Sequence, residues 1–447
     1  MSDASDPLHL MMGFQPLAHG TRGQTLVIER GEGIFVYDDR GKEYIEGASS
    51  FYVAALGYSD AELIDVATEQ FRTLPFYVSA QYRSTPNTIA LAERLAERMP
   101  LRNARIAFCS TGSEANDFLY KFLRFRNVMA GDPHRTKVIA RHGSYHGATI
   151  ASASLTGGHH EEFGLPIEGI LHVQQPERSL REPGESDDEF ATRLVDEIES
   201  LIIREDPETV AAFLSEPVSF ACGLVIPPES YWAKLQAVLA KYDILCFADE
   251  VVTGFGRTGS WWGSQTFGIV PDAVTVGKSI SAGYFPVSAI AMSGDFFSDL
   301  VRGSDKLDGF AHASTHAGHP VGAAIALKVL EIIEKRALID NARARGEELL
   351  RGLQRYADHP LVVDVRGVGL AAAVEFGQAG EKAEALAPSS VACGIFCERA
   401  RERGLLVRGT GASAIVAPPV VITADEVTEL LSRFDAALRD TEERMRI

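Results

Sequence analysis

The sequence predicts an α/β protein with a large, mostly parallel sheet domain, helices on both faces of that sheet, and a small α+β domain from the N- and C-terminal segments. Short apolar runs alternate with helical ones from about residue 104 to 290, which is typical of parallel strands joined by helical crossovers. Two of these runs, 244–248 and 273–276, are each followed by a charged residue. With 447 residues, the chain can bury a large core without disulfide bonds.

The N-terminal region predicts an arm, short strands and then helices. Residues 24–28 and 33–37 are rich in β-forming residues, and Asp38-Asp-Arg-Gly41 is typical of a turn. Residues 60–72 and 86–99 have the apolar spacing of helices, and Asn87 to Met99 follows a proline.

The central region supplies the strands of the large sheet. We expect strands at 104–108, 136–140, 210–215, 244–248, 273–276 and 287–291. The acidic segment 180–208 has apolar residues at helical spacing, and we interpret it as a solvated helix and not as a partner surface.

The C-terminal region predicts an α+β unit. Residues 320–356 indicate two long helices, and strands near 361–376 and 414–420 flank a helix at 389–403. We therefore expect three parts: an N-terminal arm with part of the small domain (1–65), a large domain (66–325) and the rest of the small domain (326–447).

Composition excludes some classes of function. The net charge of −18 argues against nucleic acid or an anionic membrane as the main partner. The five cysteines are sparse, and Cys393 and Cys397 lack a second cluster that would complete a metal site. Residues 1–6 are acidic, and no basic region followed by an apolar stretch is present. We therefore expect a reducing, cytoplasmic location, no membrane segment and no metal.

The segment Ser110-Thr-Gly-Ser-Glu-Ala-Asn116 follows an expected strand and begins a helix. Small hydroxyl residues and a glycine at a helix N-terminus can bind an anion, because free backbone N–H groups and the helix dipole both face it. A simple helix cap by Ser or Thr explains the same residues equally well. No GxxxxGK[ST] pattern is present, which disfavours a nucleotide-type phosphate loop.

Asp249 and Lys278 each follow an apolar strand. Charged groups in such positions are seldom buried without a partner or a task. A lysine that forms a Schiff base and a carboxylate that holds a cationic ring nitrogen explain both positions. Taken singly, Asp249 is also compatible with a helix cap and Lys278 with a surface lysine. For Arg257, in the glycine-rich segment after Asp249, we expect a structural ion pair.

Tyr145 follows the strand expected at 136–140 and has glycines on both sides, so its ring can stack on a planar ligand or simply be buried. Together, these strand ends offer an anion site, a stacking ring, a carboxylate and an amine. Pyridoxal phosphate requires all four groups.

From about residue 15 to the end, the chain resembles the class III aminotransferases of fold type I. The stretch Asp249-Glu-Val-Val-Thr-Gly-Phe-Gly-Arg-Thr-Gly259, with Lys278 at this distance, carries most of the resemblance. Other segments match blocks of that family: Ser110 to Asn116, Ser144-Tyr-His-Gly147, Glu216-Pro217 and Thr315-His-Ala-Gly-His-Pro320.

The resemblance implies a role for each matching residue. Lys278 holds pyridoxal 5′-phosphate covalently and moves the proton between the substrate and the cofactor, while Asp249 keeps the ring nitrogen protonated. Tyr145 and Val251 pack on the two faces of the ring, and Glu216 supports its polar edge. Ser110, Gly112 and Ser113 form the phosphate site. Thr315 reaches the phosphate of the neighbouring subunit, which implies a homodimer with shared sites; whether dimers pair into tetramers stays open.

Within the family, the chain is most similar to the ω-transaminases of the amine:pyruvate type, on the segments Gly404-Leu-Leu-Val-Arg408 and Ala417-Pro-Pro-Val-Val-Ile-Thr423. The resemblance implies that Arg408 binds a substrate carboxylate and swings away for substrates without one. A solvated arginine near a turn is the alternative. Tyr52 replaces a tryptophan common among relatives, and His316-Ala317 replaces Tyr-Ser, so the donor amine is not specified.

The predicted function is therefore transfer of an amino group from a primary amine or ω-amino acid to pyruvate or another 2-oxo acid. The alternatives are another class III transaminase, acting on GABA, ornithine, a diamine, β-alanine or taurine with 2-oxoglutarate as a possible acceptor, and a pyridoxal-phosphate aminomutase or decarboxylase. A non-catalytic binding protein is a further alternative, although the chain has no DNA-binding motif or basic stripe.

Overall fold

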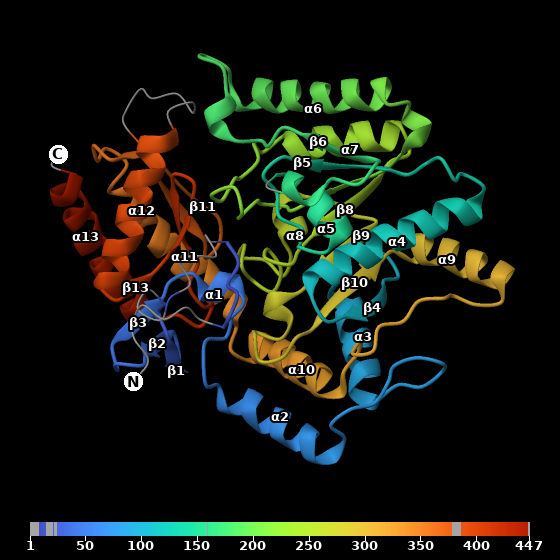
Figure 1. The fold of residues 1–447 in the computed structure, drawn as a ribbon, viewed down its shortest axis with the longest axis horizontal. Coiled ribbons are helices and arrows are strands. Elements are labelled where there is room, and N and C mark those ends of the chain that lie inside the picture. Colours follow the sequence, from blue (N-terminus) through green and yellow to red (C-terminus); the bar gives the residue numbers. More distant parts are fainter. Residues whose placement is uncertain (1–8, 15–20, 22–24, 159, 378–385, 446–447) are drawn as a thin grey trace.

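The computed structural model describes residues 9–14, 21, 25–158, 160–377 and 386–445. The described part has a large α/β body and a smaller body that contains the first strands and the last helix of the described chain (Figure 1). The acidic segment 1–6 and residue Gln24 of the first expected strand lie outside the described residues.

The large body is built on a seven-stranded sheet with the order β4-β10-β9-β8-β7-β5-β6. Its strands are β4 (Arg105–Cys109), β5 (Lys137–Arg141), β6 (Ile170–Val173), β7 (Val210–Ser215), β8 (Leu245–Asp249), β9 (Ala273–Val276) and β10 (Ser288–Met292). Neighbours from β6 to β9 pair in parallel, and β10 is antiparallel to both β4 and β9. The six strands expected in this region are therefore confirmed. The edge strand β6 was missed, because four residues with a central histidine are too short for a clear pattern.

Helices cover both faces of this sheet. The helices are α2 (Ala61–Thr73), α3 (Pro86–Arg98), α4 (Gly112–Ala130), α5 (Ile150–Leu155), α6 (Asp187–Arg204), α7 (Tyr231–Lys241), α8 (Gly263–Phe267), α9 (Gly294–Leu307) and α10 (Pro320–Lys335). On β10, Ile290 packs with α4 and α9, whereas the adjacent Ala289 and Ala291 pack with α3 and α10. This alternation follows from the two-residue period of a strand.

The smaller body joins distant parts of the chain. One sheet has the order β1-β2-β3-β13, with β1 (Ile28–Glu32), β2 (Phe35–Asp38), β3 (Glu43–Glu46) and β13 (Leu405–Leu406). The other has the order β11-β12-β15-β14, with β11 (Val362–Gly367), β12 (Ala372–Phe376), β14 (Arg408–Thr410) and β15 (Ser413–Val416). The helices here are α11 (Leu338–Gln354), α12 (Leu386–Glu402) and α13 (Ala424–Met445), and the short α1 spans Ser49–Tyr52.

Three sequence-based expectations need correction. The first strand spans Ile28–Glu32 and not 24–28, because Gly33, with φ of +56°, forms the tight turn to β2. The last strand stops at Val416 and does not reach 420. The acidic helix α6 is solvated on one side only, since its apolar residues, such as Phe190, are buried against the sheet and α7.

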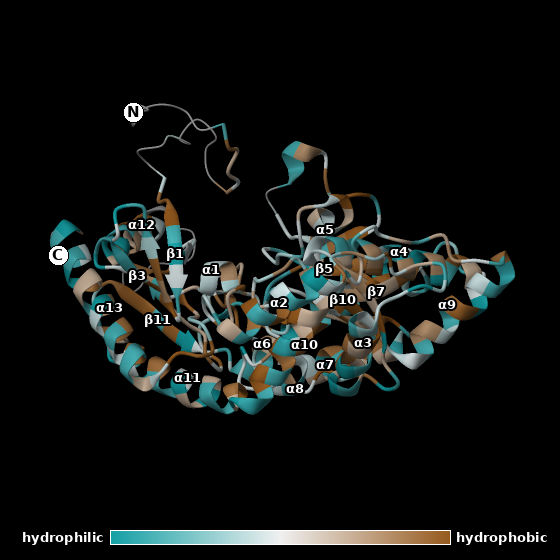
Figure 2. Cartoon of the chain, turned by 90° about the horizontal axis from the view of Figure 1, so that it is seen from below, coloured by the Kyte–Doolittle hydropathy of each residue, from teal (hydrophilic) through white to brown (hydrophobic). Residues whose placement is uncertain are grey.

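Apolar residues concentrate inside the molecule. The fully buried strand β7 is largely brown in Figure 2, whereas the outward helices α11 and α13 carry hydrophilic residues. Over the described residues, no helix combines the length and the apolar character needed to cross a bilayer.

Candidate functional site

A cavity of about 300 Å³ lies at the carboxyl edge of the large sheet, where side chains from the smaller body meet it. Its walls come from Phe14, Phe51, Tyr52, Gly112, Ser113, Tyr145, His146, Gly147, Glu216, Val218, Phe220, Ala221, Asp249, Val251, Val252, Lys278 and Arg408. Open α/β sheets bind ligands at this edge, because parallel strands all end there. The structure thus brings together nine of the eleven residues expected from the sequence; Ser110 and Thr315 are outside the walls.

The N-terminus of α4 forms one end of the cavity. Thr111 caps the helix by accepting a hydrogen bond from the Glu114 amide at 3.1 Å, which leaves the amides of Gly112 and Ser113 without an acceptor in the described chain. A Cβ on Gly112 would lie 3.1 Å from Val251 Cγ2, so only glycine fits here without movement. Ser110 lies behind this helix start, with its amide bound by the Glu114 carboxylate at 2.7 Å. Two free amides at a helix N-terminus suit an anion.

Asp249, at the end of β8, is buried and held by three donors. Its Oδ2 accepts from Asn116 Nδ2 at 2.9 Å and from His146 Nδ1 at 2.8 Å, and its Oδ1 accepts from the Val251 amide at 3.0 Å. Because a carboxylate only accepts, Nδ1 of His146 carries the proton in this pair. Charge-assisted bonds of this kind orient the carboxylate and stabilise its negative charge.

Lys278 follows β9 and has an unusual backbone conformation, with φ of +46°. Its amine has neither a hydrogen bond nor an ion-pair partner within the described residues. Burial lowers the pKa of Lys278 to about 8; the charge of Asp249 opposes this shift and that of Arg408 adds to it. A lysine with a pKa near neutrality is a nucleophile for a carbonyl group.

Tyr145 and Glu216 form a linked pair beside Asp249. The Tyr145 amide donates to Glu216 Oε1 at 3.1 Å, and burial raises the pKa of the Tyr145 hydroxyl. Glu216 Oε2 is buried without a hydrogen bond and lies 3.8 Å from His146 Nε2. Glu216 therefore approaches Asp249 through His146 and positions the loop that carries Tyr145.

These groups fit pyridoxal phosphate. The free amides of Gly112 and Ser113 can bind its phosphate, Asp249 can bind its ring nitrogen, and the amine of Lys278 can bind its aldehyde. A Cβ on Gly147 would lie 2.6 Å from Ser113 Oγ, so this glycine allows the Tyr145 loop to approach the anion site.

The opposite side of the cavity comes from the smaller body and from Phe14. Arg408, at the start of β14, has no acidic partner among the described residues, and its Nε is buried without an acceptor. Its guanidinium carbon lies 4.2 Å from the centre of the Phe51 ring. The Tyr52 hydroxyl is also buried without a partner, and its ring packs on Phe220 at 4.8 Å. Unpaired polar groups of this kind mark where a polar ligand can bind.

Sequence reasoning missed several residues of this site. Phe14 and Phe220 lie in loops and Phe51 lies in the four-residue α1, and only their aromatic character distinguishes them in the sequence. His146 lies in the segment Ser144-Tyr-His-Gly147, but its bond to Asp249 depends on β5 and β8, separated by β7 in the sheet, ending at the same edge.

The structure also corrects the expectation for Arg257. No acidic residue pairs with it in the described chain, and it donates instead to Leu370 O, Pro418 O and Ser49 Oγ.

Thr315 is exposed and lies outside the cavity of its own chain. The neighbouring Ser314 donates to Glu114 Oε1 at 2.6 Å, and Oε2 of the same carboxylate accepts from the Ser110 amide. Glu114 therefore ties the loop that contains Thr315 to the start of α4.

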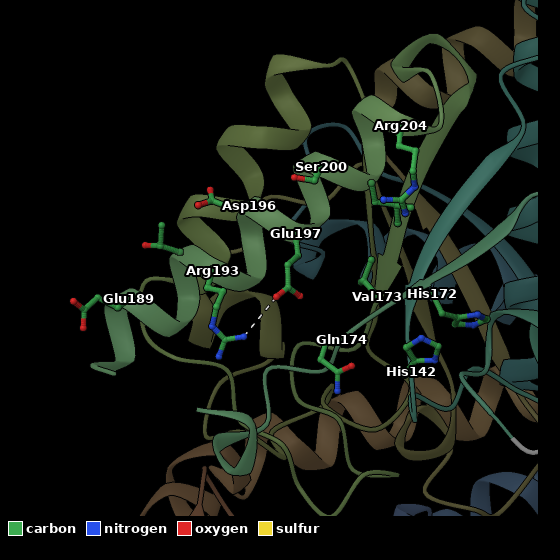
Figure 3. Close-up of a pocket in the computed structure, with 12 residues that line it drawn as sticks. His142, His172, Val173, Gln174, Glu189, Arg193, Asp196, Glu197, Ser200 and Arg204 are labelled. Carbon is green, nitrogen blue, oxygen red and sulfur yellow. Dashed lines mark ion pairs between the residues drawn. The ribbon is translucent and has the colours of Figure 1, made fainter. Parts of the chain in front are cut away.

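A second cavity, of about 750 Å³, lies between α6 and the edge strand β6 (Figure 3). Its most prominent charged group, Arg193, already pairs with Glu185 and Glu197. The rings of His142 and His172 stack at 5.3 Å, but no third metal-ligating group joins them in the part of the chain that the structure describes. This open groove lacks the converging polar groups of a binding site.

Comparisons with known proteins agree with the geometry. A family model described as "Aminotransferase class-III" matches residues 17–438. The chain is 41% identical over 424 residues to gamma-aminobutyrate transaminase 1, mitochondrial, of Oryza sativa subsp. japonica, covering 94% of this chain and 82% of the relative. It is 40% identical over 444 residues to vanillin aminotransferase of Capsicum chinense, covering 97% of this chain and 96% of the relative.

Solved structures show the same likeness. The omega transaminase of Pseudomonas jessenii in complex with PMP is 42% identical, with a TM-score of 0.94 over 97% of both chains. The PMP-bound aminotransferase of Vibrio fluvialis is 32% identical, with a TM-score of 0.93 over 97% of both chains.

The fold and the cavity thus define a pyridoxal-phosphate-dependent transaminase of fold type I. The chain belongs to the class III aminotransferases. The resemblance on which the sequence-based prediction rested is confirmed.

Proposed function

We propose that this cavity binds pyridoxal 5′-phosphate on Lys278 and transfers an amino group from a primary amine to pyruvate or another 2-oxo acid. The observation that carries the proposal is that the low-pKa amine of Lys278 and the unpaired guanidinium of Arg408 line one cavity. When bound, the cofactor supplies a ring that stabilises negative charge on the substrate carbon.

The protein's own residues perform the remaining steps. Asp249, fixed by three donors, holds the proton on the ring nitrogen. The amine of Lys278 would take the proton from the substrate Cα and deliver it to the cofactor, because its lowered pKa allows both the neutral and the charged amine near neutral pH. Tyr145 and Val251, which line the cavity, would pack on the ring, and the free amides of Gly112 and Ser113, with Ser110 behind them, would hold the phosphate.

Arg408 decides which substrates enter. A guanidinium binds a carboxylate through two parallel N–H···O bonds, which suits a 2-oxo acid, and Tyr52 and Phe51 provide an apolar wall for an amine. The solved relatives named omega transaminases support this choice.

A second candidate is transfer from GABA or another ω-amino acid. Two observations favour it: the rice relative is named a gamma-aminobutyrate transaminase, and Arg408 can bind the carboxylate of such a donor. Comparing pyruvate with 2-oxoglutarate as acceptor, and GABA with 1-phenylethylamine as donor, separates the two candidates.

We further propose a homodimer in which Thr315 reaches the phosphate of the partner's cofactor. Thr315 is exposed and outside its own cavity, and Phe76, Tyr77 and Tyr82 expose apolar rings that a second copy can cover.

We also propose the division of the chain into 1–65, 66–325 and 326–447. The sheet of β1 to β3, which the C-terminal β13 completes, supports joining the first and third parts in one small domain. For the compartment, we propose the reducing cytoplasm, since all five cysteines are free.

The test is Arg408→Ala, with the exposed Arg401→Ala as the matched control. A lost charge-assisted carboxylate contact should raise the KM for pyruvate about 10- to 100-fold. The KM for 1-phenylethylamine, which has no carboxylate, should change by less than about threefold. An unchanged KM for pyruvate would exclude Arg408 from the substrate site.

A further inference from the structure

The four residues of α1 form a left-handed turn that faces the cavity. Ser49, Ser50, Phe51 and Tyr52 have φ of 48°, 49°, 59° and 67°. L-residues avoid this region, because Cβ crowds the following carbonyl oxygen, and no glycine relieves the crowding here. The surrounding structure must therefore impose the turn, and such imposed strain gathers at functional sites.

Arg257 imposes the turn through Ser49. Ser49 Oγ donates to Ala417 O at 2.7 Å and accepts from Arg257 Nη2 at 3.2 Å. The same guanidinium donates to Leu370 O at 2.9 Å and to Pro418 O at 2.7 Å. Arg257 is 1% exposed, so one buried cation joins the turn, the β11–β12 connection and the segment after β15.

The turn places Phe51 against Arg408. The guanidinium carbon lies 4.2 Å from the Phe51 ring centre, within the range of a cation–π contact. A guanidinium stacked on a ring keeps its N–H groups in its own plane free, and those groups bind a carboxylate. No carboxylate of the described chain occupies them. The stack therefore presents Arg408 to the cavity with these N–H groups free for a carboxylate.

We propose that Phe51 is a positioning residue for the substrate carboxylate: it holds Arg408 ready to bind, and the Arg257–Ser49 contact holds Phe51. This inference rests on the proposed role of Arg408. The proposal assigns specificity for carboxylate-bearing substrates to a residue of α1, near the opposite end of the chain from the strand β14 that carries the arginine.

The test compares three substitutions in the holoenzyme. Phe51→Ala and Phe51→Leu remove the ring, and Phe51→Tyr keeps it. We expect the first two to raise the KM for pyruvate about 3- to 10-fold and the tyrosine variant to stay within about twofold. In the leucine variant, which keeps an apolar wall, the KM for 1-phenylethylamine should rise less than the KM for pyruvate, because this amine does not use Arg408.

A binding measurement separates positioning from a general disturbance. The Kd of the unreactive acid propionate, followed by its effect on the cofactor's absorbance, should rise with the KM in the alanine and leucine variants. The matched control is Phe71→Ala. Phe71 lies on α2 and is half exposed, as Phe51 is, so its substitution should change neither the Kd of propionate nor the KM for pyruvate. Ser49→Ala removes the hydrogen bond between Arg257 and Ser49 but keeps Phe51, and it should raise the propionate Kd about two- to fivefold.

Other outcomes overturn the inference. A leucine variant that behaves like wild type would show that only size matters, and a lower Kd for propionate would show that Phe51 competes with the substrate. If Arg408→Ala raises the KM for pyruvate and the Phe51 variants do not, the positioning role of Phe51 is wrong and the proposed function still stands. If Arg408→Ala has no effect, the proposed function fails.

Discussion

The two sides of the cavity are built differently. On the cofactor side, Gly112, Tyr145, Asp249 and Lys278 all follow strands of one sheet, and the acid among them has three hydrogen-bond donors. On the substrate side, Tyr52 and Arg408 come from opposite ends of the chain, and their buried polar atoms have no partners in the described residues. Paired polar groups specify one structure, whereas unpaired ones depend on a ligand. The comparison indicates that the protein itself fixes the carboxylate of Asp249, whereas Tyr52 and Arg408, like the unpaired amine of Lys278, depend on a bound ligand.

The largest expected effect tests the cofactor side. Lys278→Ala should abolish turnover and the absorbance of covalently held cofactor, because no other described lysine lines the cavity. Steady-state kinetics and an absorbance spectrum measure both. Lys234→Ala, on the outside of α7, is the control. Full activity in the Lys278 variant would sink the assignment of this cavity as the active site.

The pH dependence of cofactor capture is the next expected effect. Burial lowers the pKa of Lys278 to about 8. The reactive neutral amine therefore rises from about a tenth of the molecules at pH 7 to about nine tenths at pH 9. Stopped-flow capture of pyridoxal phosphate by the cofactor-free protein should accelerate about tenfold between these values and then level off.

The same shift affects the stability of the cofactor-free protein. Between pH 8 and 10.5, the unfolded chain binds more protons at Lys278 than the folded chain does, so stability should increase with pH in that window. Lys278→Met should remove this contribution in denaturant titrations at several pH values. A pH slope that the substitution leaves unchanged would contradict the lowered pKa.

The smallest expected effect tests the substrate side. Tyr52→Phe removes a buried hydroxyl that has no partner, so the free energy of unfolding should stay within about 1 kcal/mol of wild type or increase. The kcat/KM should change by less than about threefold. Thermal unfolding and amine kinetics measure the two quantities. A loss of stability above about 2 kcal/mol would reveal a partner for this hydroxyl and make the two sides more alike than we infer.

Local pattern was sufficient for long periodic helices and for short strands rich in β-branched residues. The strand 273–276 was expected at the residues where β9 lies, and the helices α10 and α11 lie within the expected 320–356. The edge strand β6 has as few residues as β9, but its histidine interrupts the apolar run, and the turn at Gly33 has no periodic pattern. At the site, the residues after each strand could be predicted, because a parallel sheet collects its strand ends at one edge. The contacts of Arg257 could not, since its partners come from three separate segments.

The sequence alone determined the α/β class, the residues at the strand ends and the expected cofactor, since these depend on local periodicity and on short motifs. The tertiary structure alone decided that His146 bonds to Asp249, that Phe51 stacks on Arg408 and that Arg257 clamps the left-handed turn. Each of these contacts joins residues far apart in the chain: the large sheet brings His146 to Asp249, the smaller body brings Phe51 to Arg408, and the packing of the two bodies brings Arg257 to Ser49.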